Sequence, residues 1–347
     1  MKKRSIKLLF PTMVLCLVLA ACGNGNSANS AKESANSSGA ANTQNSQNQN
    51  AANTASEATH TIKHGLGTTE IKGKPQRIVA LEFTYAEDLV ALGVDPVGVA
   101  DVEGYKKWVN TTPGLPDGVA DVGTRQEPNL EAIMALEPDL IITADYRAAN
   151  IYDKLTEIAP TIAFSPYQDE NGVDQYQEMI DTFNTIAEIT GKQDEAAKVL
   201  KDLDDTYAAA TEKLKAAGKE NGTVTLVQAY SNQNAPVFRI FTDNSMSIQI
   251  LKKIGLTNAF KESAFELYGY AEKTVESFPA VQDSNFIYIV QADDNVFEDQ
   301  LKDNKVWTNL NFVKENRTYA LGGDSWVFGG PLSAKTIVNK AVELLAP

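Results

Sequence analysis

The chain has 347 residues, of which 43% are hydrophobic and 22% are charged, and its formal net charge is −14 at pH 7. Nucleic-acid-binding proteins need a basic patch, so this acidic balance argues against that class. The sequence has two histidines, His60 and His64, which excludes a His-based catalytic triad and a His-rich metal site in the rest of the chain.

The first 22 residues resemble the signal of a bacterial lipoprotein of the Gram-positive type. Four basic residues precede an apolar run from Leu8 to Ala21, which is shorter than the ~20 residues that span a membrane. Cys22 follows Leu19-Ala20-Ala21, as in the lipobox, where the cysteine receives diacylglycerol and anchors the protein. We expect a signal peptide over residues 1–21 and a lipid anchor at Cys22 on the extracytoplasmic face of the cell membrane. An ordinary signal peptide is the alternative.

Residues 22–58 consist mostly of Asn, Ser, Ala, Gln and Gly. A segment with so few large apolar residues cannot bury enough surface to offset its ordering entropy, so a disordered tether is predicted here. Cys16 would leave with the signal peptide and Cys22 would carry lipid. The folded body would then have no thiol, which excludes a disulfide framework and a Cys-based metal site.

Apolar runs alternate with amphipathic runs in the next part of the chain. Strands are predicted at Arg77–Glu82, Pro96–Ala100, Leu140–Ala144 and Thr161–Phe164, and helices at Tyr85–Leu92, Asn129–Leu136 and Ile151–Ile158. Apolar strands separated by helices are typical of a parallel sheet that is covered on both faces. We expect residues 59–172 to form an N-terminal α/β lobe.

The pattern changes after residue 172. Apolar residues repeat at helical spacing from Tyr176 to Thr190, followed by Gly191, so a helix is predicted within residues 173–191. A second helix is predicted over Ala196–Leu214. Alternation then resumes, with strands at Thr223–Gln228, Val237–Phe241, Phe286–Gln291 and Thr318–Leu321, and helices near Ser247–Ile254 and Ala334–Leu345. The fold class is therefore α/β, with a second lobe over residues 192–347 and a bridging helix between the lobes. One large α/β domain is the alternative.

Motifs of common catalytic and nucleotide-binding sites are absent from the sequence. There is no G-x-G-x-x-G after the first predicted strand, no P-loop, no G-x-S-x-G and no S-x-x-K. An enzyme that uses paired carboxylates stays open, because an acidic chain offers many candidates. No motif in the chain therefore points to an enzyme or to a cofactor, and we expect neither. A surface-anchored hydrolase and a structural lipoprotein are the alternatives from other classes.

Several segments of the first predicted lobe resemble the siderophore-binding lipoproteins of bacterial ABC importers. Pro75–Phe83 (PQRIVALEF) and Leu92–Ala100 (LGVDPVGVA) are similar to the first two strands of those proteins, and the blocks VGTR, PNLEAI and PDLII, which start at Val122, are similar to their most recognisable motif. The second lobe is similar more loosely, through Thr274-Val275-Glu276 and Trp326. The resemblance implies two α/β lobes joined by one rigid helix, with the ligand in the cleft between them and only a small opening on its release.

Within that family the first lobe looks closest to the binders of ferric citrate and citrate-based siderophores, which are anionic chelates. The likeness implies that Arg125 and Arg147 contact the ligand. Guanidinium groups pair with carboxylates, and Arg147 follows a strand at the carboxyl end where α/β sheets bind ligands. Arg239, in a predicted strand of the second lobe, faces either the cleft or solvent. The candidates for aromatic contacts are Trp326, Tyr146, Tyr105 and Trp108.

The chain departs from the citrate binders in one respect. They often carry arginines near the loop of Trp326, and here no arginine follows Arg317. The ligand therefore stays open between citrate and a mixed citrate–hydroxamate siderophore, and haem, a catecholate siderophore and cobalamin are the alternatives. Fe(III) would be held only by the siderophore, because the chain after His64 has no His or Cys to ligate a metal directly.

The resemblance also implies a membrane partner. In this family one exposed glutamate on each lobe docks into arginine pockets of the ABC permease, and Glu131 and Glu276 match these positions. Each lies near a predicted helix start, where an acidic residue also favours the helix dipole, so a purely local role is the alternative. We expect a monomeric receptor that delivers its ligand to the permease and binds no nucleic acid.

Overall fold

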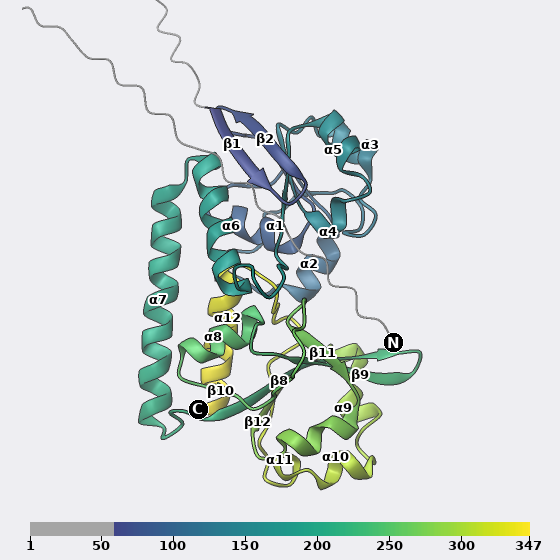
Figure 1. Ribbon diagram of the computed structural model, residues 1–347, viewed down its shortest axis with the longest axis vertical. Coiled ribbons are helices and arrows are strands. Elements are labelled where there is room, and N and C mark those ends of the chain that lie inside the picture. The colour runs from purple at the N-terminus through teal and green to yellow at the C-terminus, as the bar shows by residue number, and fades with distance from the viewer. Residues whose placement is uncertain (1–58) are drawn as a thin grey trace, which may run out of the picture. The chain divides into compact units, whose positions relative to one another are not determined.

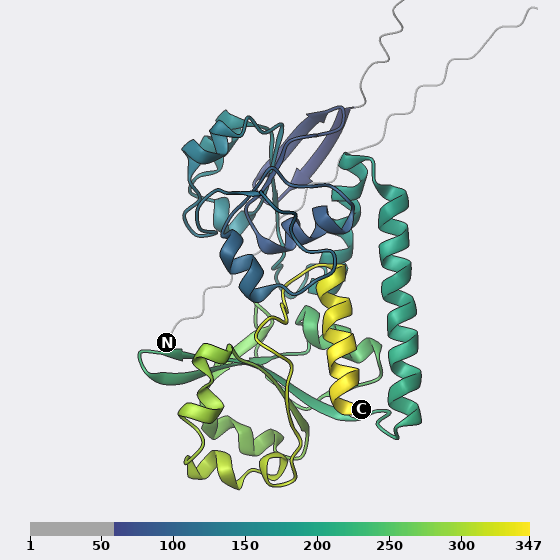
Figure 2. The same ribbon diagram turned by 180° about the vertical axis from the view of Figure 1, so that it is seen from behind.

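The computed structural model describes residues 59–347. The predicted signal peptide, Cys22 and the predicted tether lie outside the described residues. The described part of the chain contains two central β-sheets with helices packed against them (Figures 1 and 2), and the predicted α/β fold class is confirmed. None of the helices within residues 59–347 combines the length and the apolar character that crossing a membrane requires.

The first sheet has five parallel strands in the order β5-β4-β3-β6-β7. Four of them are completely buried, and the edge strand β5 (Ala120–Asp121) is more exposed. The buried strands are β3 (Ile78–Ala80), β4 (Gly98–Val99), β6 (Leu140–Ala144) and β7 (Thr161–Phe164). Because all five run the same way, the loops that follow them gather at one edge of the sheet.

Five helices accompany this sheet, and an antiparallel hairpin precedes it. The helices are α1 (Phe83–Ala91), α2 (Val102–Trp108), α3 (Leu130–Ala135), α4 (Asp145–Ala148) and α5 (Tyr152–Ile158). The hairpin consists of β1 (Thr59–His64) and β2 (Gly67–Lys72). The sequence predicted α1, α3 and α5 but missed α2, α4 and the hairpin.

Two neighbouring helices reach the cores of both sheets. α6 (Gln175–Thr190) begins after Asp174, whose carboxylate caps the helix, and ends at Gly191, which has a φ of 68°. Met179 belongs to the core of the second sheet, whereas Phe183 belongs to the core of the first. α7 (Gln193–Ala216) runs beside α6 (Figure 1). The lobe boundaries at residues 172 and 191 stay predictions.

The second sheet is mixed. Its order is β11-β9-β8-β12-β13, and β10 also pairs with β8. The parallel strands are β8 (Thr223–Asn232), β10 (Thr257–Asn258), β12 (Asn285–Ile289) and β13 (Thr318–Ala320). Two strands run antiparallel to their neighbours, namely β9 (Ala235–Phe241) and β11 (Tyr270–Lys273).

Short helices fill the connections of the second sheet. They are α8 (Met246–Lys253), α9 (Val296–Asp299), α10 (Lys305–Asn309), α11 (Asn311–Lys314) and the 3₁₀ helices η1 (Val275–Val281) and η2 (Ala292–Asp294). The last element of the chain is α12 (Pro331–Leu345). The sequence predicted α8 and α12, whereas α9, α10 and α11 are too short to show a helical period.

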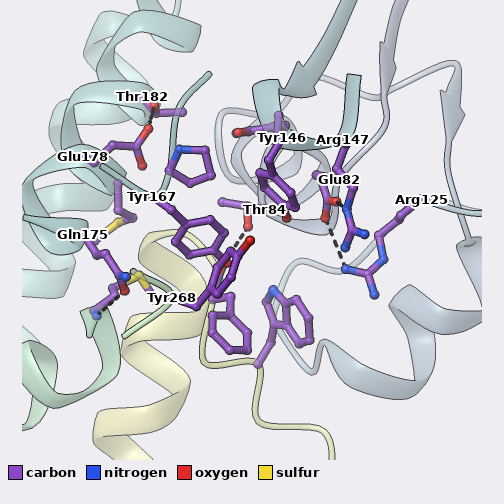
Figure 3. Close-up of a pocket in the computed structure, with 18 of the residues that line it drawn as sticks. Glu82, Thr84, Arg125, Tyr146, Arg147, Tyr167, Gln175, Glu178, Thr182 and Tyr268 are labelled. Atoms are coloured by element: carbon purple, nitrogen blue, oxygen red, sulfur yellow. Dashed lines mark hydrogen bonds and ion pairs between the residues drawn. The ribbon is translucent and has the colours of Figure 1, made fainter. Parts of the chain in front are cut away.

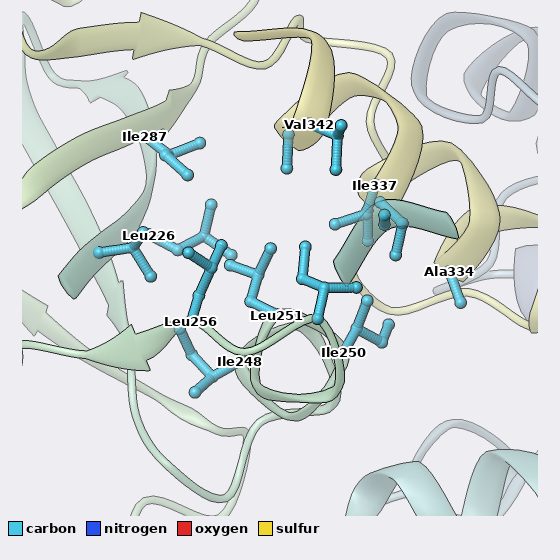
Figure 4. Close-up of a cluster of buried hydrophobic side chains, with 14 of the residues drawn as sticks. Leu226, Ile248, Ile250, Leu251, Leu256, Ile287, Ala334, Ile337 and Val342 are labelled. Carbon is cyan, nitrogen blue, oxygen red and sulfur yellow. The ribbon is translucent and has the colours of Figure 1, made fainter. Parts of the chain in front are cut away.

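Strands β8 and β12 pack against α8 and α12 through aliphatic side chains (Figure 4). Leu226 and Ile287 from the strands lie in one buried cluster with Leu251 of α8 and Ile337 of α12. Each fully buried side chain of this kind stabilises the fold by roughly 1.5–3 kcal/mol. This core fixes α12 on the second sheet, and the loop between β13 and α12 is thereby held in place.

Candidate functional site

A cavity of about 480 Å³ opens where the carboxyl ends of the first sheet meet the second sheet (Figure 3). Residues that follow β3, β5, β6 and β7 line it from one side, and residues of β9, β11 and the loop before α12 line it from the other. α6 contributes a third wall. The site thus lies where open α/β sheets ordinarily bind ligands.

Glu82 joins the two arginines of the first sheet. Arg147 donates from Nε to one carboxylate oxygen of Glu82 at 2.5 Å, and Arg125 donates from Nη1 to the other at 3.2 Å (Figure 3). The side chain of Glu82 is 8% exposed, that of Arg125 15% and that of Arg147 24%. Asp101 adds a carboxylate oxygen 3.8 Å from Nε of Arg125. Two positive charges therefore converge on one buried carboxylate.

Sheet order explains this convergence. Glu82 comes two residues after the end of β3, which lies between β4 and β6 in the sheet. Arg147 follows β6 on one side of β3, and Arg125 follows β5, which lies beyond β4 on the other side. A side chain at the carboxyl end of the middle strand can therefore reach loops from both flanks.

Aromatic rings hold the two guanidinium groups as well. The guanidinium carbon of Arg125 lies 3.9 Å from the ring centre of Phe83 and 5.4 Å from that of Trp326. That of Arg147 lies 5.0 Å from the ring centre of Tyr146. Each such cation–π contact is worth about 0.5–2 kcal/mol, depending on how far water is excluded. Both guanidinium groups are therefore oriented in the ligand-free protein.

Arg239 lines the cavity from the second sheet. Its Nε lies 3.4 Å from a carboxylate oxygen of Glu272 on β11, and its Nη1 donates to the side-chain oxygen of Gln228 at 3.3 Å. Its guanidinium carbon is 4.7 Å from the ring centre of Tyr270. Of the two directions that the sequence left open, the side chain takes the one toward the cavity.

A row of tyrosines crosses from one sheet to the other. The ring centres of Tyr146 and Tyr167 are 5.4 Å apart, those of Tyr167 and Tyr268 are 5.0 Å apart, and those of Tyr268 and Tyr270 are 6.1 Å apart. Burial raises the pKa of Tyr146 and of Tyr167 well above the usual value. Their phenols therefore stay neutral and offer hydrogen bonds and apolar faces, but no negative charge.

The wall formed by α6 is more polar. Glu178 accepts a hydrogen bond from the hydroxyl of Thr182 at 2.7 Å, and burial raises the pKa of Glu178 to about 7. Nearby, the side-chain oxygen of Gln175 accepts from the backbone N–H of Met246 at 3.1 Å. Near neutral pH a large fraction of Glu178 is therefore protonated and can donate as well as accept.

Five of the predicted ligand contacts line the cavity, and two do not. Those at the cavity are Arg125, Arg147, Arg239, Tyr146 and Trp326. The structure corrects the placement of Tyr105, which is 1% exposed and packs edge-on against Phe83 at 5.6 Å. It also corrects that of Trp108, whose ring lies 6.4 Å from Trp326. Both belong to α2, which supports the wall from behind.

Several lining residues were missed by the sequence analysis, among them Glu82, Tyr167, Glu178, Tyr268 and Tyr270. The sequence does contain a signal for Glu82, because a single charged residue follows the carboxyl end of an apolar strand there. The tyrosines had none, since they lie in loops or on β11, which showed no strand pattern.

The two glutamates expected at a permease interface are exposed and lie outside the cavity. Glu131 is in the first turn of α3, beside the first sheet, and Glu276 is in the first turn of η1, beside the second. Glu276 accepts a hydrogen bond from the hydroxyl of Thr274 at 2.5 Å, which lowers the pKa of Glu276. Their docking role stays a prediction.

Direct metal binding has no obvious ligand set in the described part of the chain. Residues 59–347 contain no group of three or more His, Cys, Asp or Glu side chains that could hold a metal ion. The arginines, tyrosines and Trp326 instead present donors and ring faces to the cavity. Such a set recognises the outer surface of an anionic or weakly charged organic molecule.

Residues 78–324 match the periplasmic binding protein family. The chain is 34% identical over 278 residues to the Fe(3+)-citrate-binding protein YfmC of Bacillus subtilis, and the alignment covers 78% of this chain and 81% of YfmC. It is 28% identical to the probable siderophore-binding lipoprotein YfiY of the same organism, with 98% of both chains covered. The crystal structure of FhuD from Vibrio cholerae, a siderophore-binding protein with Fe3+–Desferal bound, superposes with a TM-score of 0.70 at 26% identity, covering 78% of this chain and 99% of FhuD.

Proposed function

Because the chain belongs to the periplasmic binding protein family, whose members are binding proteins rather than enzymes, we propose that it captures an anionic Fe(III)-siderophore and delivers it to an ABC permease. The family membership confirms the resemblance drawn from the sequence. The proposed ligand is ferric citrate or a citrate-based siderophore, with mixed citrate–hydroxamate siderophores included. The name of YfmC and its 34% identity support the citrate type.

This proposal rests mainly on Arg125 and Arg147, which lie close together at the carboxyl ends of the strands of the first sheet. Guanidinium groups pair with carboxylates through two parallel N–H groups, and they keep their charge at any physiological pH. Arg239 faces them across the cavity, so a chelate between the sheets would meet positive charge from both sides. Iron would stay within the siderophore, which brings its own ligands.

We also propose where in the cell the protein is located. A lipid anchor on Cys22, after a signal peptide over residues 1–21 and before a tether over residues 22–58, would hold the receptor at the extracytoplasmic face of the membrane. The lipobox pattern supports this proposal, as does the similarity over nearly the full length to YfiY, which is named a lipoprotein. Glu131 and Glu276 would dock a monomeric receptor onto the permease.

Tryptophan fluorescence titrations test the ligand. Trp326 lines the cavity, so ferric citrate or a ferric citrate–hydroxamate siderophore at micromolar concentration should quench its emission. A ferric catecholate, haem and cobalamin serve as competitors. If none of the citrate-type chelates quenches while one of the competitors binds, the receptor has another ligand; turnover of an ester or glycoside would instead reopen the question of an enzyme.

A further inference from the structure

Glu82 is in direct contact with both arginines of the first sheet, and the proposed function gives it no role. We propose that Glu82 sets the charge selectivity of the cavity. It positions Arg125 and Arg147 and cancels one of their two positive charges, so that the cavity binds a chelate of low net charge in preference to a multiply charged one. This inference rests on the proposed function and narrows the class of siderophore.

Carboxylates already match the positive charges at the cavity. Arg125 and Arg147 share Glu82, and Asp101 lies within 3.8 Å of Arg125. Arg239 is 3.4 Å from Glu272. Among the described residues that line the cavity there is no lysine. The charges of the three arginines are therefore matched by three nearby carboxylates, and an incoming anion meets little net positive charge.

Citrate-type chelates differ in the charge that they bring. In ferric dicitrate, two citrates surround one Fe(III), and the complex carries several negative charges on free carboxylates. In a mixed citrate–hydroxamate siderophore, two hydroxamates and one α-hydroxycarboxylate occupy the metal, and the complex is close to neutral. Each carboxylate taken out of water needs its own cation or donors, because an unpaired buried charge is costly. The nearly balanced cavity therefore suits the mixed chelate better.

The walls of the cavity favour the same choice. Tyr146, Tyr167, Tyr268 and Tyr270 form an aromatic row, and Trp326 and Phe328 are also among the lining residues. Ring faces of this kind pack against the methylene arms of a hydroxamate siderophore. Ferric dicitrate has no comparable apolar arms, so it would gain less from this surface.

Burial keeps Glu82 on the arginines when the ligand is bound. Its side chain is 8% exposed, and each carboxylate oxygen faces one guanidinium group. A ligand that displaced it would leave the carboxylate buried without a partner. Glu82 takes one N–H group from each arginine, and a guanidinium has five. The ligand therefore adds to this ion pair through the remaining N–H groups instead of replacing Glu82.

Calorimetric titration of wild type and Glu82→Gln with two probes tests the inference. The probes are ferric dicitrate and the ferric complex of a citrate–dihydroxamate siderophore. Gln keeps the shape of Glu82 and removes its charge. Wild type should prefer the mixed chelate by about tenfold or more. In Glu82→Gln the ratio of the affinity for ferric dicitrate to the affinity for the mixed chelate should rise by about tenfold, which corresponds to ~1.4 kcal/mol. The preference for the mixed chelate should therefore shrink or vanish.

Two matched variants serve as controls. Glu82→Asp keeps the charge and should keep the preference for the mixed chelate. Glu127→Gln removes the same charge from an exposed residue that does not line the cavity, and its ratio of affinities should equal that of wild type. If Glu82→Gln does not fold, Glu272→Gln tests the same balance through Arg239, with an expected shift of the same sign.

The outcomes separate the two proposals. Tighter binding of ferric dicitrate than of the mixed chelate by wild type overturns the role given to Glu82. So does an unchanged ratio in a folded Glu82→Gln variant, or in Glu272→Gln where that variant stands in for it. Failure of wild type to bind either probe overturns the proposed function itself.

Discussion

Glu87 of α1 accepts hydrogen bonds from both the backbone N–H and the hydroxyl of Ser333 in α12, at 2.8 and 2.5 Å, although 246 residues separate the two. The backbone N–H of Gly330 donates to the same carboxylate at 3.0 Å. α1 packs in the core of the first sheet and α12 in that of the second. A fully buried carboxylate at the start of α12, where the helix dipole favours negative charge, therefore ties the helices of the two sheets together.

Removal of this tie should destabilise the protein. Glu87→Ala would leave the N–H groups of Gly330 and Ser333 and the hydroxyl of Ser333 buried without an acceptor, at a cost of about 1–3 kcal/mol for each group that water cannot reach. Chemical denaturation should show a loss of at least about 2 kcal/mol. Glu157→Ala, which changes an exposed residue of α5, should change the free energy of unfolding by less than about 0.5 kcal/mol. Equal stabilities of the two variants would contradict the tie.

Buried acids should make the protein more stable at mildly acidic pH than at neutral pH. Burial raises the pKa of Glu87 and of Glu178 to about 7 and that of Asp88 well above its usual value. A carboxyl group with a raised pKa holds its proton more tightly in the folded state than in the unfolded state, so stability falls as the pH rises through the range between the two pKa values. The melting temperature should therefore drop from about pH 5.5 to pH 8.

Asp88→Asn isolates one contribution to this dependence. Both carboxylate oxygens of Asp88 are buried, and neither has a hydrogen-bond partner within residues 59–347, so ionisation there has no compensation. Asn cannot ionise, and the variant should lose less stability than wild type between pH 5.5 and pH 8. If the melting temperatures of the two proteins fall by the same amount between pH 5.5 and pH 8, Asp88 does not titrate in this range.

The two arginines at Glu82 should act as a unit on ligand binding. Arg125→Ala and Arg147→Ala should each weaken binding of an anionic chelate by about ten- to a hundredfold, the worth of a charge-assisted hydrogen bond of roughly 1.5–3 kcal/mol. Lys at either position should restore only part, because it lacks the planar fork. The double variant should lose less binding free energy than the two single variants lose together, since both arginines share one carboxylate.

Calorimetry measures these affinities. Lys154→Ala removes a positive charge from an exposed position of α5 away from the cavity and should bind as wild type does. Unaltered affinity in both arginine variants would place the ligand elsewhere.

The permease interface can be separated from ligand binding. A double variant, Glu131→Ala with Glu276→Ala, should bind the chelate with nearly wild-type affinity, because both residues lie outside the cavity. Uptake of the ferric siderophore by iron-limited cells should fall, and more than in either single variant, because both sides of the receptor would have to dock together. Glu157→Ala with Glu220→Ala is a matched control, since both residues are exposed and neither lines the cavity. Wild-type growth of the first double variant would rule out the docking role.

The elements that were predicted well are those whose burial shows directly in the sequence. Leu140–Ala144 and Thr161–Phe164 are strands with the predicted bounds, because strands buried on both faces are continuously apolar. Arg147 could be placed at the site because it follows the first of these. The hairpin over residues 59–72 was missed, since its exposed Thr and Lys residues give no apolar run.

The pairing within the site could not be predicted. The sequence alone does not show that Arg125 and Arg147 meet at Glu82. Their meeting depends on the order of the strands, in which β4 separates β3 from β5. Tyr105 failed for a similar reason. It lies near the family-like segments, but the turn into α2 points its ring into the core rather than toward the cavity.

The lining of the cavity begins at Glu82 and ends at Gly329, so the site draws on both ends of the described chain. A nascent or truncated polypeptide that stops before Trp326 would contain both arginines of the first sheet, but neither the indole wall nor α12. The complete site therefore forms only after the last segment of the chain has folded back onto α1. A ligand bound in this cavity would thus report a completely folded chain, because a copy that stops before Trp326 has only part of the lining.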